Sequence, residues 1–134
     1  MLLLAAFSFV SLAINAEVTN ELSGKEKNAV LAFEELQYDF GKVPQGDVLE
    51  HLFKFTNSGN DKLVIQSVQP SCGCTGATIG DKKEFLPGET GEIKVTFNTQ
   101  GREGVNSKTI NVSSNDNSQP SITLSFTCEI LNNK

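Results

Sequence analysis

The sequence predicts an all-β domain, a sandwich or barrel of about seven short strands. Apolar and polar residues alternate with a period of two in several segments, which is typical of strands with one face in a core. Residues that favour turns, mainly Gly, Pro, Asn and Asp, separate these segments. No stretch shows the apolar spacing of an amphipathic helix. A chain of 134 residues fits a single domain.

Each expected strand follows from its own pattern. The strand segments are residues 30–34, 37–40, 48–57, 63–69, 91–98, 107–113 and 121–130. Alternation is clearest in the last segment, where Ile122, Leu124, Phe126 and Cys128 share one side. The same parity argument assigns one core to Phe53, Phe55, Ile93, Val95, Phe97, Leu124 and Phe126.

The first residues differ from the rest of the chain. Residues 1–16 carry no charge, are mainly apolar and end at Ala16, which predicts a signal peptide cut before Glu17. The run is shorter than the roughly 20 residues of a membrane-spanning helix, so no membrane span is expected after cleavage. Residues 17–29 are polar and predict a flexible lead-in, followed by the folded domain at 30–134. The expected location is therefore periplasmic or extracellular.

Charge and motif content exclude several functions. The net charge is −5 and no basic cluster is present, which argues against nucleic-acid binding. The sequence has no phosphate-binding loop, nucleophile elbow or zinc-protease motif, and His51 is its single histidine. We therefore expect no enzyme and no cofactor, and we expect a structural or binding role in the cell envelope. The expected partner is an envelope protein, bound through loops or by adding a strand to a sheet edge.

Several short motifs occur together in one order and carry a family resemblance. They are Tyr38-Asp39-Phe40-Gly41 with Gly46, Phe53-x-Phe55-x-Asn57-x-Gly59, Leu63-x-Ile65, Ser71-Cys72-Gly73-Cys74-Thr75, Pro87-Gly88-Glu89, Ile93-x-Val95-x-Phe97-x-Thr99, Gly104, Lys108 and Ser114-Asn115-Asp116. Over residues 33–131 the chain resembles a bacterial secreted family known as domain of unknown function 1573. The resemblance implies an immunoglobulin-like antiparallel sandwich, related to domains of cilium and centrosome proteins such as hydin. It implies no activity.

The Cys72-Gly73-Cys74 box is the main candidate for chemistry. In an extended strand, residues two apart lie about 6.6 Å apart at Cα and face the same way. That distance is near the upper limit for a disulfide, and Gly73 lets the backbone bend to close it, so a bond there would be strained and easily reduced. The reduced pair would instead offer two sulfur atoms for copper or zinc. Three interpretations stay open: packed or disulfide-bonded residues, thiol redox chemistry, and metal handling as the alternative function.

Cys128 and His51 are the remaining candidates. Cys128 lies on the inward side of the last strand and is expected to act as a small apolar residue, with pairing to Cys72 or Cys74 as the alternative. His51 has the parity of Phe53, which predicts a histidine inside the core or at its edge. If His51 met all three cysteines, it would complete a four-ligand zinc site. The box, at the end of the strand that begins at Leu63, should react with alkylating agents before Cys128 does.

Overall fold

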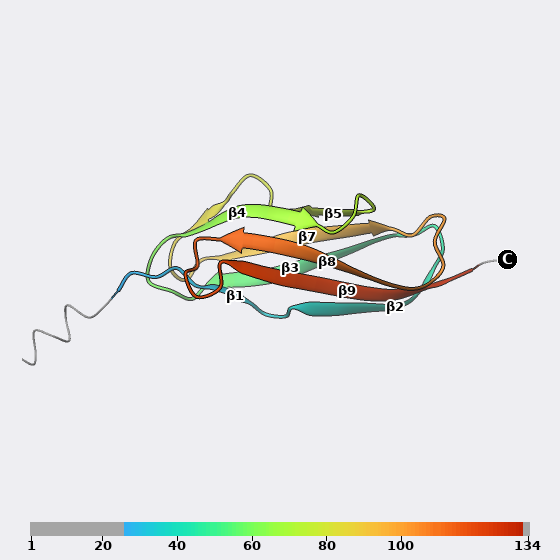
Figure 1. Ribbon diagram of the computed structural model, residues 1–134, viewed down its shortest axis with the longest axis horizontal. Helices are drawn as coiled ribbons and strands as arrows, with labels where there is room; N and C mark the ends of the chain where they lie inside the picture. Colours follow the sequence, from blue (N-terminus) through green and yellow to red (C-terminus); the bar gives the residue numbers. More distant parts are fainter. Residues whose placement is uncertain (1–25, 133–134) are drawn as a thin grey trace, which may run out of the picture.

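The computed structural model describes residues 26–132, which form two β-sheets packed face to face (Figure 1). One sheet contains, in spatial order, β1 (Leu31–Phe33), β3 (Val48–Asn57), β7 (Thr90–Asn98) and β5 (Thr75–Thr78). The other contains β2 (Gln37–Pro44), β9 (Ser121–Leu131), β8 (Gly104–Ser114), β4 (Leu63–Pro70) and β6 (Glu84–Phe85). The order β1-β3-β7-β5 facing β9-β8-β4 is that of an immunoglobulin-like sandwich. The predicted all-β fold is confirmed.

All seven expected strand segments are strands, and the structure adds two that the pattern missed. β5 has the sequence Thr-Gly-Ala-Thr, without large apolar residues to alternate, and β6 has two residues. One pairing also differs from a wholly antiparallel sandwich, because β2 runs parallel to β9. After β1 the chain crosses from the first sheet to the second. There its next strand, β2, lies beside β9 and runs in the same direction.

The core consists of aromatic and aliphatic side chains from both sheets. All seven residues assigned to it by parity are buried, which confirms that assignment. Phe97 of the first sheet contacts Phe126 of the second, with ring centroids 5.4 Å apart. Burying a side chain of this size stabilises the fold by about 1.5–3 kcal/mol, so the aromatic contacts between the sheets are a main source of stability.

Buried polar side chains join the loops at both ends of the sandwich, and they belong to the motifs that carry the family resemblance. Asn57 is fully buried and bonds four backbone groups. The Asp116 carboxylate accepts a hydrogen bond from the Leu31 N–H at 3.0 Å, which links β1 to the β8–β9 loop. At the other end, Thr99 Oγ1 accepts from the Gly46 N–H at 2.9 Å. These motif residues therefore hold the fold together.

The start of the described chain lies against the domain. The Asn28 N–H donates to Asn60 Oδ1 at 2.7 Å, and Ala29 is buried in the core. These residues belong to the lead-in expected at 17–29, the rest of which lies outside the described residues together with the expected signal peptide at 1–16. Within residues 26–132, no helix is long and apolar enough to cross a membrane.

Candidate functional site

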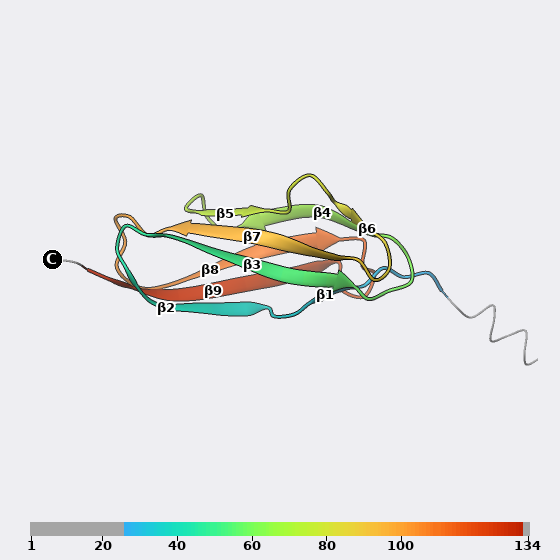
Figure 2. The same ribbon diagram turned by 180° about the vertical axis from the view of Figure 1, so that it is seen from behind.

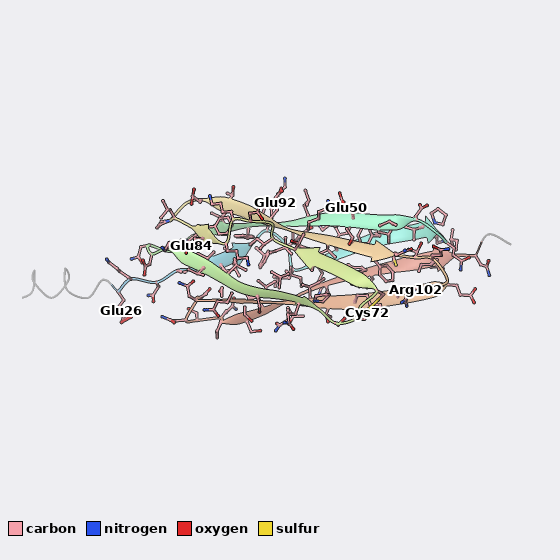
Figure 3. All side chains as sticks on the ribbon, turned by 90° about the horizontal axis from the view of Figure 1, so that it is seen from above. Glu26, Glu50, Cys72, Glu84, Glu92 and Arg102 are labelled. Carbon is pink, nitrogen blue, oxygen red and sulfur yellow. A yellow bond between two sulfur atoms is a disulfide. The ribbon has the colours of Figure 1, made fainter. Side chains whose placement is uncertain are left out.

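Cys72 and Cys74 lie in a tight turn directly after β4 and are joined by a disulfide bond. Figure 3 shows Cys72 beyond the end of β4, at the same end of the sandwich as Arg102. The two Cα atoms are 5.3 Å apart, closer than in an extended strand, because the Thr75 N–H donates to the Cys72 carbonyl and closes a turn. With both sulfur atoms in the bond, this form offers no thiolate to a metal ion or a substrate.

Thr75 anchors the disulfide turn to the sandwich. Its side chain is buried, and its Oγ1 lies 3.8 Å from Cys72 Sγ and 3.7 Å from Cys74 Sγ. Cys74 is half-buried against the hydrophobic core. The turn is therefore a fixed part of the surface at the point where the chain passes from β4 to β5.

Cys128 is a separate, unpaired thiol in the core. It is 2% exposed and forms no bond with Cys72 or Cys74. Burial raises the pKa of the Cys128 thiol, and the nearby Asp39 carboxylate raises it further, while Lys108 acts in the opposite direction. A neutral, buried thiol is a poor nucleophile, so Cys128 occupies its position as a small apolar residue.

His51 lies at the edge of the core, among aromatic rings. Its imidazole stacks on Tyr38 with centroids 3.6 Å apart and meets Phe53 edge to face. Its Nε2 lies 2.5 Å from a carboxylate oxygen of Glu35, an ion pair when the ring is protonated. These neighbours include no cysteine. Among residues 26–132, no three His, Cys, Asp or Glu side chains are grouped so that they could hold a metal ion.

The surface around the disulfide has an unusual composition. From Leu63 to Gly80, through β4, the disulfide turn and β5, the chain carries no charged side chain, although 20% of all residues are charged. We call the surface formed by residues 63–80 the β4–β5 side. β4 and β5 belong to different sheets, yet they contact each other across this side of the sandwich.

A groove of about 200 Å³ lies between these two strands. Its lining includes the buried Ile65 and the half-buried Val68, Ala77 and Ile79, which belong to or pack against the core. The groove therefore has an apolar floor and lies between the edge strand β5 and the part of β4 that continues beyond its two-residue pairing with β6. Its full lining is Ile65, Gln66, Ser67, Val68, Ala77, Thr78, Ile79, Gly80 and Lys83.

The free edge of β5 presents unpaired backbone groups to this groove. In an antiparallel ladder, successive residues point their N–H and C=O groups alternately to one neighbour and to the other. The Thr99 N–H donates to the carbonyl of Asp47, which directly precedes β3. By this alternation, the odd-numbered residues of β7 direct their backbone hydrogen bonds to β3, and the even-numbered residues direct theirs to β5. Gly76 and Thr78 therefore pair with β7. The N–H and C=O of Ala77 point away from β7 and have no partner among the described residues.

The other sheet edges carry features that prevent strand pairing. β2 has a register irregularity and includes Lys42 and Pro44, and β6 is two residues long and follows Lys83. β1 has three residues and is followed by Glu34. Short length, charge, proline and bulges are the usual protection of a sheet edge. Among the described edge strands, β5 and the three-residue β1 carry no charge, proline or register irregularity, and β5 is the longer of the two with four residues.

The period-two pattern did not predict the free edge of β5. The sequence feature that could have indicated it is the length of the uncharged segment from Leu63 to Gly80. The alternation of apolar and polar residues does not reveal such a segment. The groove itself depends on the approach of β4 and β5 from different sheets, which no local pattern predicts.

Comparison with known proteins places the chain in a family and agrees with the fold. Residues 31–130 match a family described as "Protein of unknown function (DUF1573)". No protein of curated function matches the sequence.

Three solved structures are similar to this chain at low sequence identity. A protein of unknown function from Porphyromonas gingivalis W83 is 17% identical with a TM-score of 0.69, over 93% of this chain and 54% of that one. The VesB protease of Vibrio cholerae is 12% identical with a TM-score of 0.59, over 86% and 34%. The ASH/PapD-like domain 7 of human CEP192 is 11% identical with a TM-score of 0.61, over 82% and 91%. The chain thus spans about half of the Porphyromonas protein, and at these identities the likeness concerns the fold alone.

Proposed function

We propose that this chain, which belongs to the DUF1573 family of proteins of unknown function, is a non-catalytic binding domain that holds a partner protein in the cell envelope. The observation that carries the proposal is the β4–β5 side. It combines a groove with an apolar floor, a free strand edge and a run of uncharged residues from Leu63 to Gly80 in a chain with net charge −5. Such a surface is suited to protein contacts.

The rest of the described structure supports binding over catalysis. The imidazole of His51 is packed against aromatic rings, and Cys128 is buried with a raised pKa. Cys72 and Cys74 are bonded to each other. None of these groups faces the groove of the β4–β5 side with a free nucleophile or base. The location in the envelope is supported by the apolar, uncharged run at residues 1–16, which ends at Ala16.

Localisation and cross-linking in living bacteria test the proposal together. The full 134-residue chain is produced with a photo-reactive benzoyl-phenylalanine at Thr78, which is exposed on β5. The control places the same group at Thr123, which is exposed on the outer face of β9. After illumination, the exported fraction should contain a larger adduct for the Thr78 variant and none for the Thr123 variant. The mature chain should begin at or within a few residues of Glu17.

Two results would contradict this function. A chain that stays in the cytoplasm with residues 1–16 attached would remove the envelope location. Equal adducts from both positions, or none from either, would show that the β4–β5 side has no specific partner.

A further inference from the structure

We propose that β5 binds an extended, uncharged segment of the partner protein as an added β-strand, with apolar side chains at alternate positions facing the groove. This inference rests on the proposed binding function and names the chemistry of its partner. Addition of a strand to a free edge is a known mode of peptide recognition, in which backbone hydrogen bonds supply affinity and pockets for alternate side chains supply specificity.

The backbone geometry selects β5 over the facing strand β4. Ala77 offers both an N–H and a C=O toward the open side, as the ladder alternation shows. Directly after β4, the Ser71 N–H donates to the Thr109 carbonyl of β8. By the same alternation, the backbone groups of Val68 and Pro70 point away from β8, toward the open side. Pro70 has no N–H to donate. β5 can therefore donate and accept at the centre of its edge, whereas β4 ends in a residue that blocks pairing.

The side chains define what the added strand must carry. Ala77 and Ile79 are half-buried, and with Val68 and Ile65 they form the apolar floor of the groove. Every second side chain of a strand paired with β5 would face this floor, because side chains alternate across a strand. From Leu63 to Gly80 no side chain is charged, so the floor offers no partner to a charged residue of the added strand, and the exposed Lys83 is the charged residue of the groove lining.

The shape of the edge favours a single flexible segment over a second rigid sheet. Figures 1 and 2 show that the backbone of the loop before β5 and that of the loop after it both extend beyond the strand. The first of these loops contains the Cys72–Cys74 disulfide, which fixes its backbone. β5 has four residues, which correspond to about 13 Å of strand. A single extended segment fits so short an edge between two projecting loops more readily than a whole second sheet does.

A displayed library of random nine-residue peptides, panned on the exported, oxidised protein, tests strand addition. The enriched peptides should carry apolar residues at alternate positions and no charge between them. One enriched peptide is then synthesised with N-methyl groups on one or the other set of alternate backbone amides. Methylation of the set that faces β5 should weaken binding at least about tenfold, whereas the other set should change it less than about twofold.

Matched variants of the protein provide the second readout. Ala77→Pro removes the outward N–H and keeps the ladder with β7, since an edge strand tolerates proline where its N–H faces solvent. It should weaken peptide binding at least about tenfold, whereas Ala77→Ser, which keeps the N–H, should stay within about twofold. The methylated peptides give the same answer without any variant, so a failure of Ala77→Pro to fold does not weaken the test.

The possible contradictions are distinct. Equal effects of both methylated sets would show that the peptide does not pair as a strand. A dimer of the protein alone that Ala77→Pro dissociates in sedimentation would assign the edge to a second copy. A library without enriched peptides would overturn strand addition, and the Thr78 cross-link would still decide whether the binding function stands.

Discussion

The substitution Asn57→Ala tests whether the family motif serves the fold. Asn57 is 0% exposed; its Oδ1 accepts from the Val30 and Gly59 N–H groups, and its Nδ2 donates to the Asp61 and Phe85 carbonyls. A hydrogen bond contributes about 0.5–1.5 kcal/mol net, and a buried group left without its partner costs more. We therefore expect a loss of about 3–5 kcal/mol in the free energy of unfolding. That is a large fraction of the 5–15 kcal/mol typical of a whole domain.

Urea unfolding followed by far-ultraviolet circular dichroism measures this loss, since the chain has no tryptophan. The matched control is Asn111→Ala, because Asn111 is exposed and accepts one hydrogen bond from the Ser121 hydroxyl. The control should change the free energy by less than about 0.5 kcal/mol. A loss below about 1 kcal/mol for Asn57→Ala, with an unchanged urea dependence, would refute the assignment of Asn57 as a structural anchor.

Four further predictions concern the core, a turn and the sulfur atoms. Phe97→Ala should lower the free energy of unfolding by about 3–5 kcal/mol in the same assay, and an unchanged midpoint would mean that the assigned face is wrong. Gly59→Ala should destabilise the protein by about 1–3 kcal/mol, because the added Cβ would lie 2.1 Å from a backbone carbonyl oxygen. In the reduced native protein, iodoacetamide should label Cys72 or Cys74 before the buried Cys128, as mass spectrometry of the peptides would show; the reverse order would contradict the burial of Cys128. Because the folded pKa of Cys128 is raised above its ordinary value of 9.0, the unfolded chain ionises first, so stability should fall as the pH rises above about 9. Cys128→Ser should lack this part of the alkaline loss, and equal losses in both proteins would contradict the raised pKa.

The strands and the core could be predicted because their signal is local. Phe53 and Phe55, or Leu124 and Phe126, share a face simply because side chains alternate along an extended chain. The position of the cysteine box after the strand that starts at Leu63 follows from the end of that alternation at Pro70. β5 was missed because Gly76 and Ala77 are too small to mark a buried face.

The sequence pattern by itself determined that this chain is an all-β domain, which residues fill its core and where the cysteine box lies, since all three depend on neighbours along the chain. The tertiary structure alone decided that β2 runs parallel to β9, that His51 stacks on Tyr38, and that Cys128 stays apart from the disulfide. It also decided which strand edge stays free. The unpaired N–H and C=O of Ala77 result from pairing between strands distant in sequence, and the groove results from two sheets meeting at β4 and β5. Period-two alternation shows which side of a strand is buried, but pairing is a long-range contact that leaves no mark in the local pattern.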